Sequence, residues 1–193
     1  MEGAQDAEPD ELDTELMLRV RCGDERAMRT LMTRHKDGVY AMACRMLSCN
    51  AEAEDLTQRT FIRVWKAASS YEPTAKFTTW LFTILKNLVF NEMRRQSRKP
   101  VSSLEEREQQ GYCAAQEGHS SPDDALRQKE LEEIVEKALK ALPPKARMAM
   151  ELRRVHQMNY EEIGAVLDMS LPAVKSLLFR SRQCLKESLA EYL

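Results

Sequence analysis

The 193-residue chain lacks the features that mark membrane proteins and exported proteins. No apolar run approaches the roughly 18 residues that a membrane-spanning helix needs. The N-terminus has neither the basic region nor the apolar stretch of a signal peptide, and residues 1–16 are acidic instead. These absences predict a cytoplasmic protein without membrane insertion.

Residues suited to metal binding and catalysis are also scarce. The five cysteines are an odd number with no CxxC pair, and the three histidines have no ligand spacing to them. The sequence shows no glycine-rich phosphate loop and no nucleophile with an accompanying base. We therefore expect no cofactor, no metal site and no enzymatic activity.

A large excess of one charge is missing as well. The formal net charge is −2, although 31% of the residues are charged. Any binding to nucleic acid must therefore come from local basic patches and not from the whole molecule. The acidic residues 1–12 carry no periodic apolar face, which predicts a disordered N-terminus.

What the sequence does contain is a series of segments with helical apolar spacing, which predicts an all-α fold. Residues 100–122 interrupt this series with Ser, Gly, Gln and Glu and few core-forming residues, the composition of a flexible linker. We therefore predict two small helical domains, residues 13–99 and 123–193, joined by that linker.

The first domain opens with a predicted helix from about Thr14 to Cys22. Gly23 stands where a left-handed C-terminal cap belongs, and Asp24 can cap the helix that follows. Because the turn is short, these two helices should be neighbours.

A long helix is predicted over residues 76–99. Its core-facing stripe, spaced i, i+4, i+7 and i+11, consists of Phe77, Leu81, Ile84 and Leu88. Off that stripe lie aromatic, amide and cationic side chains, among them Trp80, Phe82, Asn87 and Arg94. Such a face suits unstacked bases and phosphates, but the aromatics could equally pack on a neighbouring helix.

Residues 51–68 form another predicted helix. Phe61, Val64, Trp65 and Ala68 share one stripe, and charged residues lie largely off it. Taken alone, the charged side has its simplest interpretation as a solvated face.

The second domain ends in a pattern typical of a helix-turn-helix. Asn159 with Glu162 forms a capping signature, a three-residue turn follows, and Ser170 with Pro172 starts a basic helix. The second helix of such a motif enters the major groove. Residues Leu171, Pro172, Ala173, Lys175 and Ser176 would then meet base edges, and Arg180 and Arg182 phosphates.

At this point the chain resembles a family. AEDLTQRTFIRVW, FTTWLFTILKNLVFNEMRRQSRK and LPPKARMAMELRRVHQMNYEEIGAVLDMSLPAVKSLLFRSRQCLK are similar, in this order, to segments of the sigma factors of bacterial RNA polymerase. The likeness is strongest to the two-domain extracytoplasmic-function group. It covers nearly everything outside the acidic N-terminus and the linker.

The resemblance implies a function, a set of partners and a set of site residues. The protein would be an alternative sigma factor that binds core RNA polymerase and directs promoter-specific initiation. Residues 13–99 would be sigma region 2 and residues 123–193 sigma region 4. The implied partners are the beta-prime clamp helices and the beta flap of core polymerase, promoter DNA, and an anti-sigma factor.

By the same resemblance, the core polymerase-binding residues are Asp55, Leu56, Gln58, Phe61 and Trp65. The residues that open the −10 element are Tyr71, Lys76, Trp80, Asn87 and Arg94. The helix-turn-helix would read the −35 element.

The sequence departs from the family pattern at a few of these positions. Asn91 stands where aspartate is usual, and Leu177 replaces a frequent arginine of the reading helix. An alternative therefore stays open, a stand-alone helix-turn-helix regulator that binds duplex DNA directly. That alternative leaves the face between Asp55 and Trp65 without a function.

Overall fold

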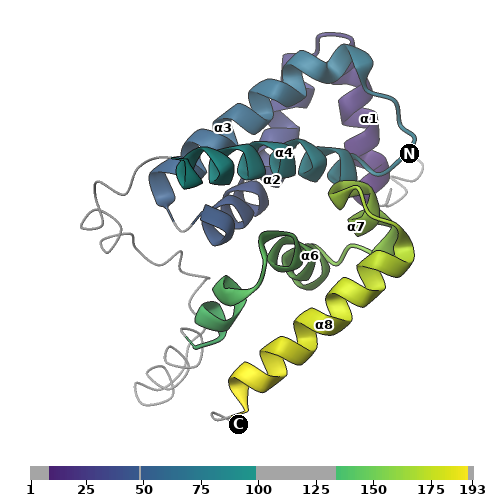
Figure 1. Ribbon diagram of the computed structural model, residues 1–193. Coiled ribbons are helices and arrows are strands. Elements are labelled where there is room, and N and C mark those ends of the chain that lie inside the picture. Colours follow the sequence, from purple (N-terminus) through teal and green to yellow (C-terminus); the bar gives the residue numbers. More distant parts are fainter. Residues whose placement is uncertain (1–8, 48, 99–133, 191–193) are drawn as a thin grey trace, which may run out of the picture. The chain divides into compact units, whose positions relative to one another are not determined.

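A computed structural model describes residues 9–47, 49–98 and 134–190. These residues form helices joined by turns and contain no strand, which confirms the predicted all-α fold (Figure 1). The chain divides into two compact units, Met1–Gly111 and Tyr112–Leu193. The predicted linker, residues 100–122, lies outside the described residues.

The described residues of the N-terminal unit form a bundle of four α-helices and one short 3-10 helix. The elements are α1 (Pro9–Arg21), α2 (Glu25–Leu47), α3 (Asn50–Ala67), η1 (Ala68–Ser70) and α4 (Phe77–Ser97). Helix α4 packs against α1, α2 and α3.

The core of this unit is built from large aliphatic and sulfur-containing side chains that are almost fully buried. They include Met17, Leu31, Met42, Leu56, Leu81, Leu85 and Leu88. Burying each such side chain contributes about 1.5–3 kcal/mol before conformational entropy is counted. The bundle therefore has a continuous core that holds α4 rigidly.

Helix α1 begins at Pro9, earlier than the predicted Thr14, so the predicted disorder of residues 9–12 is wrong. Three interactions explain the longer helix. Asp10 lies in the first turn, where the helix dipole favours acids, and its carboxylate pairs with Lys76 Nζ at 2.7 Å. Asp13 is buried and its carboxylate contacts Arg34 Nε at 2.8 Å and His35 Nε2 at 2.7 Å. Residues 1–8 lie outside the described part of the chain.

The turn between α1 and α2 has the predicted geometry. Gly23 has φ +88°, the left-handed conformation that costs glycine little. The Asp24 carboxylate accepts hydrogen bonds from the main-chain N–H groups of Arg26 (2.8 Å) and Ala27 (3.1 Å). The bond from Ala27, and next the bond from Arg19, lower the pKa of this carboxyl. The predicted cap is confirmed.

The C-terminal unit contains a helical segment over residues 134–141 and three further helices. These are α6 (Pro144–Arg154), α7 (Tyr160–Leu167) and α8 (Leu171–Leu189). Leu152, Ile163 and Val174, one from each of α6, α7 and α8, are fully buried and form the centre of a small core.

The turn between α7 and α8 spans three residues, as predicted for a helix-turn-helix. The capping box at the start of α7 is present, with Asn159 and Glu162 exchanging hydrogen bonds of 2.8 and 2.7 Å. Ser170, in contrast, makes no side-chain cap bond to α8. Its hydroxyl could reach the N–H of the second or third helical residue, and Pro172 at the second position has none.

Candidate nucleic-acid interface

Helix α3 exposes a face that differs from the predicted one. Asp55, Gln58 and Trp65 are exposed as expected of an interface, but Leu56 and Phe61 are 1% and 3% exposed. These two side chains point into the bundle, and their contact with core polymerase stays a prediction. They support the face from behind.

The sequence interpretation also missed a residue on this face. Ile62 is 52% exposed and Trp65 is 41% exposed, although Trp65 was placed on the buried stripe with Phe61 and Val64. Because positions 55, 58, 62 and 65 repeat at three and four residues, they share one side of α3. The exposed side of α3 thus has an apolar centre next to polar residues, which a solvated face does not need.

Helix α4 presents a row of three predicted site residues. Trp80, Asn87 and Arg94 are spaced by seven residues, nearly two full turns, and therefore lie on one line along the helix. Asn87 and Arg94 are exposed, and Trp80 is half-buried. The predicted core stripe needs adjustment, since Ile84 is partly exposed while Phe82 is buried.

Tyr71, a predicted −10 residue, lies in the core of the N-terminal unit. Its side chain is 1% exposed, and its ring lies edge-on to Trp80 and Phe77 with centroid distances of 5.1 and 6.4 Å. Burial raises the pKa of the Tyr71 phenol, whose hydroxyl makes no hydrogen bond within the described part of the chain. Tyr71 is thus a core residue beneath Trp80, and contact between its ring and DNA would require the loop to move.

Lys76 is exposed at the start of α4, as a phosphate-binding residue should be. Its ammonium group is engaged, however, in the ion pair with Asp10 of α1. The side chains of both partners keep contact with solvent, at 50% and 34% exposure. The pair can therefore be exchanged for another anion at a small cost.

The outer face of α8 carries the predicted base-reading and phosphate-binding residues. Pro172, Lys175, Ser176, Arg180 and Arg182 are exposed, and Leu171 and Ala173 are partly exposed. Val174 and Leu178 pack inward against α6 and α7. One side of α8 is therefore packed against the rest of the C-terminal unit, and the other side is exposed to solvent.

Two details of α8 were not predicted. Phe179 is 61% exposed on the outer side, between the cationic residues Lys175 and Arg180. Arg182 donates a hydrogen bond of 3.2 Å to the Tyr160 hydroxyl, which lowers the pKa of that phenol. An aromatic residue among the cations of a basic helix was the available sequence signal for Phe179.

Neither a metal site nor a membrane helix is found among the described residues. No group of three or more His, Cys, Asp or Glu side chains there could hold an ion. No described helix is long and apolar enough to cross a membrane.

Comparison with known proteins matches both units to one family. Sigma-70 region 2 matches residues 31–99, and Sigma-70 region 4 matches residues 132–185. The chain is 32% identical over 176 residues to the ECF RNA polymerase sigma-E factor of Escherichia coli, covering 90% of this chain and 92% of that protein. The chain belongs to the extracytoplasmic-function (ECF) sigma factors. It functions as an alternative sigma factor in transcription initiation.

Other relatives agree with this assignment. The ECF sigma factor SigE of Mycolicibacterium smegmatis is 36% identical over 173 residues. The match covers 88% of this chain and 65% of that longer protein. The sigma factor RpoE of Bartonella quintana, solved with the anti-sigma factor NepR, superposes with a TM-score of 0.65 at 26% identity. That match covers 84% of this ECF sigma factor and 96% of RpoE.

Proposed function

We propose that three faces of this sigma factor divide the work of initiation. The outer side of α3 binds the clamp helices of the polymerase beta-prime subunit. The outer side of α4 captures bases of the opened −10 element, and α8 reads the −35 element as duplex. The observation that carries this proposal is the alignment of Trp80, Asn87 and Arg94 along one side of α4, where Asn87 and Arg94 are exposed and Trp80 is half-buried.

The α3 face has the composition of a protein-binding site. Trp65 and Ile62 supply exposed apolar area, and Asp55 and Gln58 supply polar groups beside it. Interfaces typically combine an aromatic or aliphatic anchor with a polar rim. We therefore assign Asp55, Gln58, Ile62 and Trp65 to the contact with core polymerase, with Leu56 and Phe61 as its support.

The α4 face suits single-stranded DNA. A base leaving the duplex loses stacking worth a few kcal/mol, which ring contacts and amide hydrogen bonds offset. Trp80 offers a ring face, Asn87 a donor and an acceptor, and Arg94 a cation for the backbone. The rigid packing of α4 fixes these three groups before DNA arrives.

The α8 face suits the major groove. Lys175 and Ser176 have hydrogen-bonding groups near the helix start, and Arg180 and Arg182 lie where phosphates would pass. Phe179 adds an exposed apolar group of the kind that contacts thymine methyls. We include it among the −35 residues.

The α8 face provides no strong electrostatic anchor. Even if Lys175, Arg180, Arg182 and Lys186 all met phosphates, the salt slope would be about −3.6, at roughly 0.9 per phosphate. The formal net charge of −2 gives the chain no general attraction to DNA. Core polymerase, by fixing the spacing of the two units, would supply the missing affinity.

The protein's environment follows from the same proposal. A polymerase subunit without a catalytic constellation acts in the cytoplasm and not as an enzyme. Because the related RpoE was solved with an anti-sigma factor, we infer that this chain has a partner of that class too. The α3 face is its most exposed apolar surface in the described N-terminal unit.

Transcription by purified core polymerase with and without this chain tests the proposal. The template is a promoter selected from a random library by the wild-type holoenzyme. Specific transcripts and permanganate-reactive thymines in the −10 region should require the chain, and Asn87→Ala should abolish the reactivity while core binding persists. Nanomolar sequence-specific binding of duplex by the free chain would instead favour a stand-alone regulator.

A further inference from the structure

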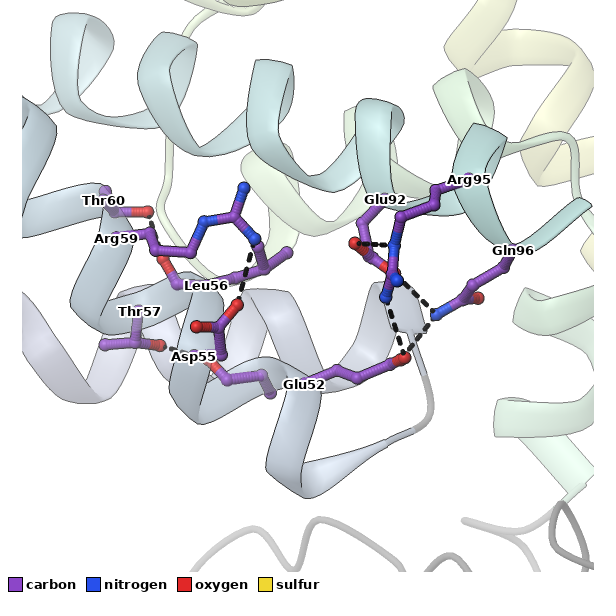
Figure 2. A network of polar contacts seen from close by, with 10 residues as sticks. Glu52, Asp55, Leu56, Thr57, Arg59, Thr60, Glu92, Arg95 and Gln96 are labelled. Carbon is purple, nitrogen blue, oxygen red and sulfur yellow. Dashed lines mark hydrogen bonds and ion pairs between the residues drawn. The ribbon is translucent and has the colours of Figure 1, made fainter. Parts of the chain in front are cut away.

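A polar network connects the end of α4 to the start of α3. Figure 2 shows Glu92, Arg95 and Gln96 of α4 reaching toward Glu52 of α3. Arg95 donates to both carboxylate oxygens of Glu92 at 2.6–2.9 Å, and Gln96 Nε2 donates to Glu52 at 2.5 Å and to Glu92 at 3.5 Å. Arg95 Nη2 also lies 4.0 Å from Glu52.

Glu92 is the unusual member of this network because it is only 7% exposed. A buried carboxylate is tolerated only when it is paired and hydrogen-bonded, and a well-packed apolar side chain is often as stable at such a site. The stability of the bundle therefore gives no reason for a glutamate here. What a buried polar group can add is a fixed geometry.

That geometry bears on the neighbouring side chains of α4. Asn91 and Arg94 alternate in sequence with Glu92 and Arg95, and both are exposed. Successive residues of a helix differ by about 100° in direction, so holding Glu92 and Arg95 against α3 fixes the directions of Asn91 and Arg94. The Arg94 guanidinium lies 3.5 Å from the Asn91 side-chain oxygen, which orients it further.

The network also adjoins the α3 face. A hollow of about 530 Å³ is lined by Ala51, Glu52, Asp55, Leu56, Arg59, Glu92 and Arg95. Hydrogen bonding by Glu92 raises the pKa of the Arg95 guanidinium most, and the charges of Glu52 and Asp55 raise it further. Asp55 is therefore shared between the α3 face and the surroundings of Arg95.

We propose that Glu92 is a positioning residue for promoter opening, resting on the function proposed above. It holds the last two turns of α4 so that Asn91 and Arg94 face DNA in a fixed orientation relative to the α3 face. Glu92 itself touches neither DNA nor polymerase. Its loss slows opening of the −10 region without weakening the fold or the binding of core polymerase.

The test uses the full chain and reconstituted holoenzyme on the selected promoter. Glu92→Leu keeps the volume, and Arg95, with its side chain 55% exposed, stays hydrated without its partner. Glu92→Gln keeps one acceptor for Arg95, and Glu25→Gln removes an equal charge from the exposed first turn of α2 as the matched control. Opening is followed at saturating holoenzyme with a fluorescent base analogue at −10, alongside thermal unfolding and core affinity.

We expect Glu92→Leu to slow opening about fivefold or more, Glu92→Gln to be intermediate, and Glu25→Gln to match wild type. A template with a pre-opened −10 bubble should restore Glu92→Leu to the wild-type transcription rate, which a merely structural defect would not allow. If Glu92→Leu does not fold, Glu92→Gln and Gln96→Ala decide the same question. Wild-type opening by folded variants would overturn the positioning role alone, whereas an inactive wild-type holoenzyme would overturn the proposed function.

Discussion

The ring of Trp80 meets the ring of Tyr71 at 67°, with 5.1 Å between their centroids. Tyr71 is buried, and Trp80 covers it while remaining half-exposed on the α4 face. The same tryptophan therefore belongs to the core and to the proposed −10 surface. Substitution of Trp80 should consequently lower both stability and promoter opening, whereas substitution of Asn87 should lower promoter opening alone.

Trp80→Ala should lower the free energy of unfolding by about 2–4 kcal/mol, because it removes contacts with Tyr71 and Phe77 and leaves a cavity. Asn87→Ala, at an exposed position, should change it by about 0.5 kcal/mol or less. Denaturant unfolding measures both. Equal stability of the two variants would contradict the packing assigned to Trp80.

Ile62→Ser together with Trp65→Ala should weaken core polymerase binding at least about tenfold, as loss of interface anchors does. Since both side chains are exposed, the unfolding free energy should change by only about 0.5 kcal/mol each. Titration of labelled core polymerase measures the affinity.

The control for that pair is Leu56→Ala on the inner side of α3. It should cost about 2–5 kcal/mol of stability by opening a cavity. At temperatures where it remains folded, it should bind core nearly as well as wild type. If the Ile62 and Trp65 substitutions left the affinity for core polymerase unchanged, the α3 face would be excluded as the docking surface.

Asp10→Asn should tighten binding of a single-stranded −10 oligonucleotide about two- to threefold at low salt, because it removes a carboxylate that competes with a DNA phosphate for Lys76. The gain should fade as salt screens both contacts. Glu11→Gln, in the same first turn, is the matched control, and fluorescence anisotropy is the measurement. If Asp10→Asn still tightened binding in a Lys76→Ala variant, the effect of Asp10 would not depend on its ion pair with Lys76.

Gly164→Ala should destabilise the C-terminal unit by about 1–3 kcal/mol. A Cβ at this position would lie 2.7 Å from the main-chain oxygen of Met169, which outweighs the gain of about 1 kcal/mol in helix propensity. Ala165→Gly on the exposed side of α7 should cost only about that propensity difference. A stabilised Gly164→Ala variant would mean that the turn can relax.

The phenol of Tyr71 gives a pH dependence with a definite sign. Its pKa is raised in the folded state by burial above the usual 10.0, so its contribution to stability is complete below pH 10.0 and disappears as the pH rises through the folded-state pKa. Tyr71→Phe should therefore lose less stability than wild type between neutral pH and pH 11. Thermal unfolding across that range tests it.

The features predicted correctly from the sequence depend on local chemistry. The left-handed Gly23, the Asp24 cap and the Asn159–Glu162 capping box are each decided within a few residues. The three-residue turn before α8 is likewise decided by neighbouring residues. Ser170 makes no cap bond, and Pro172 removes only one of its two possible donors, since the N–H of Ala173 remains.

The errors concern side chains whose surroundings come from distant parts of the chain. A four-residue apolar stripe describes a helix with one packed side, whereas α4 contacts α1, α2 and α3, so Phe82 is buried as well. On α3, helical spacing placed Trp65 on one stripe with Phe61 and Val64, whereas its side chain is 41% exposed. Glu92 could not be recognised, since its link to Glu52 through Gln96 spans 44 residues.

Helix α4 is constrained on two sides. One side is committed to the core through Phe77, Leu81, Phe82, Leu85, Leu88 and Val89, and another carries the line of Trp80, Asn87 and Arg94. A substitution in this helix must therefore preserve both the packing of the core and the proposed DNA-binding side chains. A saturation library of α4 should contain far fewer silent changes than one of α2, whose outer side faces only solvent over Arg29, Thr33 and Lys36.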